Sequence, residues 1–173
     1  MGAVLDENGI REALVRMADA IAVSIPPGCP VGVVGIRARG DDLARRIIEL
    51  LASRGVGEIA TGVLDITLYR DDLAEIGPSA VVRTTEIEFD VAGRYVVLVD
   101  DVIYTGRSIR AALAALIDLG RPRAIRLAVL VDRGGRELPI QPDFVGVRSG
   151  PADGHVRVKL VETDGVDCVE AER

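Results

Sequence analysis

The sequence has few aromatic residues, since it lacks tryptophan and only 3% of its residues are Phe, Trp or Tyr. A folded core therefore depends on Val, Ile, Leu and Ala, and 49% of all residues are hydrophobic. Short uninterrupted aliphatic runs are typical of parallel strands that helices cover on both faces. The length of 173 residues fits one such domain, and no repeat, linker or low-complexity tract divides residues 1–173.

Cysteine and histidine are also scarce. Cys29 and Cys168 lie far apart and outside any Cys-x-x-Cys or Cys/His cluster, which argues against a disulfide framework or a zinc site. His155 is the one histidine, so a Ser-His-Asp or Cys-His mechanism would have to rest on it. The sequence shows no signal-peptide pattern, and no apolar run approaches membrane-spanning length. These absences predict a cytoplasmic protein with free thiols.

A basic excess is also missing, because 21 Lys and Arg residues are outnumbered by 27 Asp and Glu, for a formal net charge of -6. Such a balance argues against a protein that coats DNA or RNA, although it leaves a local basic face open. The phosphate-binding patterns G-x-x-x-x-G-K-[ST] and G-x-G-x-x-G do not occur, and neither do G-x-S-x-G or H-E-x-x-H. A P-loop, a dinucleotide fold and a zinc protease are therefore not predicted.

Helical and strand patterns alternate along the chain. Apolar residues at helical spacing predict helices at 9–24, between Gly40 and Gly55, and at 108–119. Aliphatic or alternating runs predict strands at 31–36, 59–66, 81–89, 95–99 and 124–131, followed by two or three short strands. The strand at 81–89 alternates with charged residues, which is typical of an edge or antiparallel strand. This order indicates an α/β fold, a mostly parallel sheet flanked by helices, with a small β-rich appendage.

Three polar loops follow predicted strands, at residues 37–40, 67–77 and 100–108. In open α/β sheets, ligands bind where the carboxyl ends of the strands meet. We therefore expect these loops to converge on one site.

Segment 96–108 combines two kinds of binding group. A predicted strand ends in Asp100 and Asp101, and residues 105–108 open a helix whose free N–H groups favour phosphate. Taken separately, the two halves could be a polar strand end and a helix cap. Together they suit a ligand that carries phosphate along with hydroxyl groups or Mg²⁺, such as a ribose 5-phosphate.

The same segment, Val-Val-Leu-Val-Asp-Asp-Val-Ile-Tyr-Thr-Gly-Arg-Ser, resembles the phosphoribosyl pyrophosphate (PRPP) motif of type I phosphoribosyltransferases. Longer stretches are similar to one branch, the bifunctional pyrimidine-operon regulators and uracil phosphoribosyltransferases of the PyrR family. These stretches are residues 64–73, 97–122, 127–134 and 136–140.

The resemblance implies a type I phosphoribosyltransferase-like fold with a small β-rich hood, and an enzyme that converts uracil and PRPP to UMP and pyrophosphate with Mg²⁺. Asp100 and Asp101 would hold the ribose hydroxyls and, mainly through water and PRPP, the metal. Together with Arg70, they are the expected catalytic residues. Arg70 lies in the stretch that matches the family's mobile loop, and the alternative interpretation of this residue is a solvated loop arginine. Arg133 would lie near the base, and a homodimer or higher homo-oligomer is implied. The expected PRPP-binding residues are Arg37, Ala38, Arg39, Gly40, Asp100, Asp101, Tyr104, Thr105, Gly106, Arg107 and Ser108.

The family also binds the messenger RNA leader of pyrimidine genes, and the resemblance implies that Arg16 and Arg136 belong to the RNA face. Gly135, where the family pattern has His, belongs to the segment expected over the base. At Asp19 and Gln141 the pattern instead has His and Arg. These changes remove positive or hydrogen-bonding groups, and phosphate neutralisation supplies much of RNA affinity. Three functions remain open: a uracil phosphoribosyltransferase, a nucleotide-sensing RNA-binding attenuation regulator, and a diverged paralogue that binds PRPP or a nucleotide and acts on another base or on none.

Overall fold

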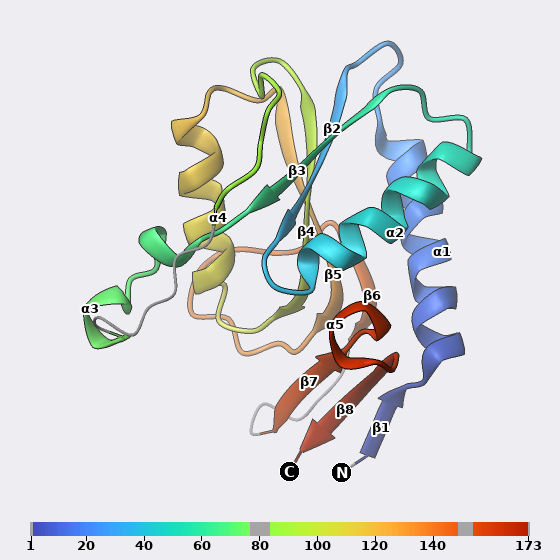
Figure 1. Cartoon of the computed structure of the whole chain (residues 1–173), viewed down its shortest axis with the longest axis vertical. Helices are drawn as coiled ribbons and strands as arrows, with labels where there is room; N and C mark the ends of the chain where they lie inside the picture. The colour runs from blue at the N-terminus through green and yellow to red at the C-terminus, as the bar shows by residue number, and fades with distance from the viewer. Residues whose placement is uncertain (1, 77–83, 149–153, 173) are drawn as a thin grey trace.

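The computed structural model describes residues 2–76, 84–148 and 154–172 (Figure 1). Its helices are α1 (Glu7–Ser24), α2 (Gly40–Ser53), α3 (Leu73–Ile76), α4 (Arg107–Asp118) and α5 (Val161–Asp164), with a 3₁₀ turn, η1 (Thr67–Tyr69). Its strands are β1 (Gly2–Leu5), β2 (Val31–Ile36), β3 (Ile59–Leu64), β4 (Tyr95–Ile103), β5 (Ala124–Asp132), β6 (Phe144–Arg148), β7 (His155–Lys159) and β8 (Cys168–Glu172).

Five strands form a parallel sheet in the order β3-β2-β4-β5-β6. The register aligns the first residues of neighbouring strands, since Val31 lies opposite Ile59 and Tyr95, and Tyr95 lies opposite Ala124. The carboxyl ends of β2, β3, β4 and β5 consequently meet at one edge of the sheet, where ligands bind in such folds.

Helices cover both faces of this sheet, as Figure 1 shows, with α1 and α2 on one side and α4 on the other. In β4, Val97 and Val99 belong to the apolar core that also contains residues of α1 and α2. Val96 and Leu98 belong to the second core, beneath α4. Strand side chains alternate between faces, so a strand buried on both sides must be apolar at every position, and this is why the aliphatic runs predict it.

A second sheet is antiparallel and has the order β1-β8-β7. We refer to these three strands and α5 as the hood. Val156, Val158 and Val169 are buried against the core on the α1 and α2 side, which anchors the hood to the larger sheet. Because β1 pairs with β8, the two ends of the described chain lie side by side (Figure 1).

The predicted fold class is confirmed, and the strand assignments need three corrections. Strand β4 continues through both carboxylates to Ile103 instead of ending at 99. Of the predicted strand 81–89, residues 81–83 lie outside the described residues, and the rest forms an isolated antiparallel bridge between Glu86 and Val63. The C-terminal strands do not all belong to the appendage, because β6 pairs with β5 in the large sheet.

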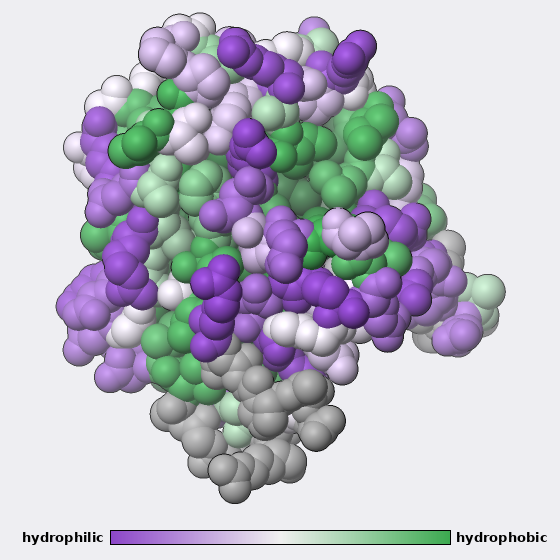
Figure 2. All heavy atoms as spheres, turned by 180° about the vertical axis from the view of Figure 1, so that it is seen from behind, coloured by the Kyte–Doolittle hydropathy of each residue, from purple (hydrophilic) through white to green (hydrophobic). Residues whose placement is uncertain are grey.

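The exposed large apolar side chains come from separate elements, among them Val23 of α1, Leu68 of η1 and Ile117 of α4. Figure 2 shows hydrophilic and hydrophobic residues interleaved over the back of the molecule. None of the helices in the described ranges has the length and apolar character needed to cross a bilayer.

Candidate active site

Two adjacent carboxylates lie near the carboxyl end of β4. Asp100 is 6% exposed, and its Oδ1 accepts the Asp101 N–H at 2.9 Å, while Asp101 Oδ1 accepts the Val102 N–H at 2.7 Å. Burial raises the pKa of Asp100 well above its usual range, and the charge of Asp101 raises it further. Burial also raises the pKa of Asp101, against the lowering effects of the Val102 N–H and of Arg39. Two adjacent carboxylates with perturbed pKa values, one buried and one half-buried, are typical of a functional site at such a strand end.

The loop of residues 37–40 packs against these carboxylates because Gly40 has no side chain. A Cβ at Gly40 would lie 2.6 Å from the Val99 carbonyl oxygen and 3.4 Å from Asp100 Oδ1. Helix α2 begins at Gly40, so its free N–H groups lie at the same edge of the sheet and favour an anion there. Within the loop, Arg39 lines the cleft described below, whereas Arg37 Nη2 donates to Glu86 at 3.0 Å.

Residues 105–108 complete the turn between β4 and α4 and begin the helix. Gly106 occupies the left-handed region at φ 93°, which glycine adopts without strain, and α4 begins at the next residue. The Thr105 carbonyl oxygen accepts the N–H groups of Glu137 and Leu138 at 3.0 and 3.2 Å, which holds the turn in place. The exposed Ser108 and the half-buried Thr105 present hydroxyl groups beside the free N–H groups of the helix, an arrangement suited to phosphate.

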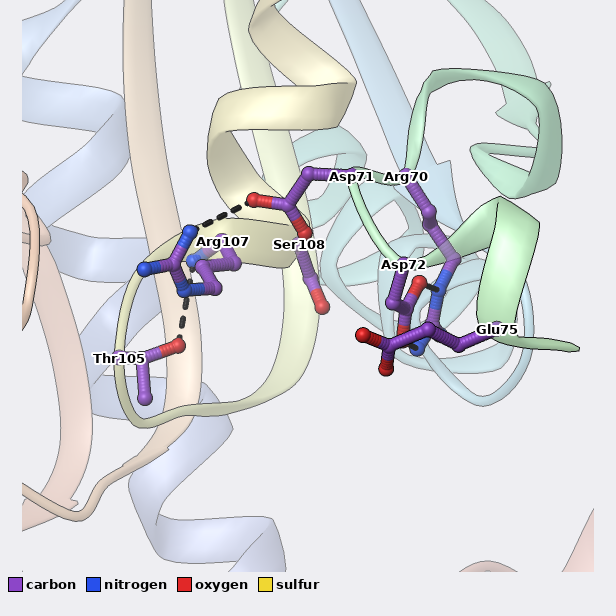
Figure 3. Close-up of a pocket in the computed structure, with 7 residues that line it drawn as sticks. All are labelled: Arg70, Asp71, Asp72, Glu75, Thr105, Arg107 and Ser108. Atoms are coloured by element: carbon purple, nitrogen blue, oxygen red, sulfur yellow. Dashed lines mark hydrogen bonds and ion pairs between the residues drawn. The ribbon is translucent and has the colours of Figure 1, made fainter.

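A cavity of about 530 Å³ opens over this turn (Figure 3). Arg107 lies between two carboxylates there, donating to Asp71 at 2.7 Å and to Glu137 at 2.8 Å. Arg70 makes a bidentate pair with Asp72 at 2.8 and 2.6 Å. Both arginines therefore already have anionic partners, which use two N–H donors of each guanidinium. The residues that line the cavity are Arg70, Asp71, Asp72, Glu75, Thr105, Arg107 and Ser108.

A second cavity of about 570 Å³, which we call the cleft, separates the large sheet from the hood. Arg39 and Asp101 contribute to one wall, and β7 and Asp164 of the hood form the other. Arg133, just beyond β5, also lines it, and its guanidinium lies 4.0 Å from the centre of the Tyr104 ring. Its cationic residues, Arg39, Arg133, Arg157 and Lys159, outnumber its two carboxylates, Asp101 and Asp164.

The two arginines predicted to contact RNA are placed differently. Arg16 is exposed on α1 and donates to the Gly146 carbonyl oxygen at 3.2 Å. The Arg136 side chain is 15% exposed, and its guanidinium donates to Asp132 at 2.7 Å and to the Tyr104 carbonyl oxygen at 2.9 Å. Arg136 thus holds the segment after β5 against the turn between β4 and α4. A role in RNA binding remains a prediction for both residues.

Seven of the predicted site residues line these two cavities, and Arg37, Ala38, Gly40, Asp100, Tyr104 and Gly106 line neither. Arg39, Asp101 and Arg133 line the cleft, and Arg70, Thr105, Arg107 and Ser108 line the other cavity. The sequence did not predict the hood residues of the cleft, because nothing in the sequence indicated that β7 faces β4. The alternation of Val156 and Val158 with charged residues was the one available signal, since it predicts a strand with a solvated cationic face.

Comparison with known proteins places this arrangement in context. The sequence matches the phosphoribosyl transferase domain model over residues 5–163. It is 51% identical over 169 residues to the bifunctional protein PyrR of Deinococcus radiodurans, covering 96% of this chain and 92% of that protein. It is 55% identical over 162 residues to the bifunctional protein PyrR of Thermus thermophilus, covering 93% and 90%.

Among solved structures, the hypoxanthine phosphoribosyltransferase of Trypanosoma cruzi superimposes with a TM-score of 0.76. The match covers 100% of this chain and 97% of that one at 17% sequence identity, so it establishes the fold alone.

Proposed function

Because this chain belongs to the phosphoribosyl transferase domain family and, within it, to the PyrR proteins, we propose that it transfers the phosphoribosyl group of PRPP to uracil, forming UMP and pyrophosphate. The observation that carries the proposal is the meeting of three features at one edge of the sheet. These are the adjacent carboxylates Asp100 and Asp101, the loop 37–40 with the start of α2, and the segment 105–108 at the start of α4. A ligand with a phosphate, vicinal hydroxyls and a diphosphate matches all three.

Each part of the site has a task in this reaction. Asp100 and Asp101 accept hydrogen bonds from the ribose hydroxyls, and the turn 105–108 donates to the 5-phosphate. Arg39 donates to the pyrophosphate, and Arg133 lies on the side of the cleft that receives the base. The bond from C1 of the ribose to pyrophosphate breaks, the bond from C1 to the base nitrogen forms, and the proton of that nitrogen is lost. Catalysis then consists of positioning and charge stabilisation, without a side-chain nucleophile.

The donor set at the site fits Mg²⁺. Within the described residues, no group of three or more His, Cys, Asp or Glu side chains forms a metal cage. Asp100 and Asp101 supply adjacent carboxylate oxygens, and Mg²⁺ is usually bound through one or two carboxylates, water and substrate phosphates. When bound, the ion would neutralise charge on the departing pyrophosphate.

Formation of UMP from uracil and PRPP with Mg²⁺ tests the proposal directly. The wild-type chain should form UMP, and Asp100→Asn/Asp101→Asn should lower kcat/KM at least about a hundredfold because it removes both hydroxyl acceptors. Asp90→Asn, in the turn before β4, is the matched control and should retain activity. Failure of the wild type to form UMP, with formation of another nucleotide from a panel of bases, would instead identify a diverged paralogue.

A second function is supported by the name of the relatives, which are bifunctional proteins about half identical to this chain. We propose that the chain also binds pyrimidine-gene leader RNA in response to uridine nucleotides, as a homodimer or higher homo-oligomer. Asp19, which replaces a family histidine, is ion-paired with Arg54 at the end of the neighbouring helix, so the charges of both residues are partly compensated.

A further inference from the structure

An ion pair crosses the cleft between the loop 37–40 and the hood. Arg39 Nε and Nη2 donate to the two carboxylate oxygens of Asp164 at 3.1 and 2.9 Å. The two side chains are 29% and 21% exposed, so the pair is partly shielded from water. A bidentate pair fixes the plane of a guanidinium, whereas a single contact leaves it free to rotate.

Asp164 is itself held by the hood. Its Oδ2 accepts the Leu160 N–H at 2.9 Å, and its own N–H donates to the Leu160 carbonyl oxygen at 2.6 Å. Hydrogen bonds from Arg39 and from the Leu160 N–H lower the pKa of Asp164, so the carboxylate stays charged. The carboxylate is therefore a fixed anionic anchor, and Arg39 is the member of the pair that belongs to the loop.

The pair leaves Arg39 able to bind a ligand. A guanidinium has five N–H donors, and two of them are used by Asp164. The remaining donors, including both on Nη1, belong to a side chain that lines the cleft together with Asp101. The opposite wall carries Arg157 and Lys159, of which Lys159 is paired with Glu170 at 2.9 Å, so cationic side chains lie on both sides of this space.

We propose that Asp164 is a positioning residue that orients Arg39 toward the pyrophosphate group of PRPP, which makes the hood part of the pyrophosphate subsite. This inference rests on the proposed phosphoribosyltransferase function. An arginine without such a partner loses rotamer freedom when a ligand binds, and this loss of entropy weakens binding. Because the pair with Asp164 already fixes the Arg39 side chain, less entropy is lost when the ligand binds. Three N–H donors already compensate the charge of Asp164. Its repulsion of the diphosphate is therefore smaller than the gain in affinity from orienting Arg39.

The hood contains a matched control. Asp167 makes the same kind of contacts, accepting Arg46 at 2.6 and 2.8 Å and the Val161 N–H at 2.7 Å. Asp167 and Arg46 line a different cavity, between α1 and α2, outside the cleft. Asp167→Asn therefore removes a bidentate ion pair from the same part of the fold without affecting Arg39, and Arg46 keeps its second pair, with Glu162 at 2.6 and 2.8 Å.

The test compares the KM for PRPP, the KM for uracil and kcat in the full-length wild type, Asp164→Asn and Asp167→Asn, with PRPP binding in MgCl₂ measured by calorimetry. Asp164→Asn should raise the KM and Kd for PRPP about tenfold, which corresponds to one immobilised side chain, and leave the KM for uracil and kcat within about threefold. Asp164→Glu should recover part of the affinity, and Asp167→Asn should leave PRPP binding unchanged at a similar Tm.

Equal PRPP affinities in Asp164→Asn and Asp167→Asn would overturn the inference, and so would tighter binding in Asp164→Asn, which would make Asp164 a competitor of the ligand. In both cases UMP formation by the wild type would leave the proposed function standing. A wild type that does not bind PRPP would contradict the proposed function itself, and the inference with it.

Discussion

At Gly40 the first turn of α2 and the backbone of β4 come into direct contact. A Cβ there would lie 2.6 Å from the Val99 carbonyl oxygen and 3.2 Å from Asp100 Cα, both of them backbone atoms that cannot rotate away. Gly57 offers a contrast, since a Cβ on it would meet no atom within 4 Å. The two glycines look alike in the sequence, and their surroundings distinguish them.

Gly40→Ala should therefore lower the free energy of unfolding by about 1–3 kcal/mol, because the helix must move away from β4. It should also raise the KM for PRPP, because loop 37–40 moves with the helix. Gly57→Ala should change stability by less than about 1 kcal/mol and leave PRPP binding unchanged. Urea unfolding and steady-state kinetics on the two variants measure both effects, and similar results for both alanines would contradict this account of Gly40.

Among the elements, η1 places the loop that carries Arg70. Tyr69 Oη donates to Asp118 of α4 at 2.8 Å, and the Tyr69 carbonyl oxygen accepts Arg110 Nη2 of the same helix at 2.6 Å. These two bonds attach the loop to α4, the helix whose first turn belongs to the predicted phosphate site. A shift of η1 relative to α4 would therefore also shift Arg70 relative to that site.

Tyr69→Phe removes the bond to Asp118 and should raise the KM for PRPP about threefold while changing stability little, since the bond lies at the surface. Tyr95→Phe is the control, because it removes a comparable bond, from Tyr95 Oη to Ser24 Oγ at 2.8 Å, on the other side of the sheet. The control should lower stability by about 1 kcal/mol and leave the KM unchanged. Unaltered PRPP kinetics in Tyr69→Phe would show that η1 does not position the loop.

For the whole molecule, the net charge of -6 bears on RNA binding. An acidic protein gains no general attraction for RNA, so binding has to come from a few placed arginines, and each phosphate contact adds to the salt dependence. Arg16 is exposed and donates one hydrogen bond, to the Gly146 carbonyl oxygen, whereas Arg136 is held by Asp132 and the Tyr104 carbonyl oxygen.

If the chain binds pyrimidine leader RNA, Arg16→Gln should weaken binding and lower the slope of log K against log salt by about one, because one phosphate contact is lost. Arg123→Gln, an exposed arginine at the amino edge of the sheet, should leave the slope unchanged. Filter binding over a range of salt concentrations, with and without UMP, provides the measurement. No nucleotide-dependent binding at low salt would mean that the chain lacks the second function.

Much of the fold could be predicted from local patterns. Strands such as 31–36 and 124–131 are apolar at nearly every position because both of their faces are buried, and that property is visible residue by residue. The continuation of β4 through Asp100 to Ile103 could not be predicted this way, since two carboxylates normally end a buried run. They lie within the strand because its last residues pair with β5 at the edge where the cleft opens, with Ile103 opposite Asp132.

The sequence by itself determined the α/β class, the order of the main helices and strands, and the segment 96–108 with its carboxylates and helix start, because all of these depend on residues close together in the chain. The tertiary structure alone decided which distant residues share the cleft. Arg39 and Asp164 are 125 positions apart, and they meet because the β1–β8–β7 sheet packs on the core near the carboxyl edge of the large sheet. Such a meeting depends on how two sheets pack, and no local periodicity encodes it.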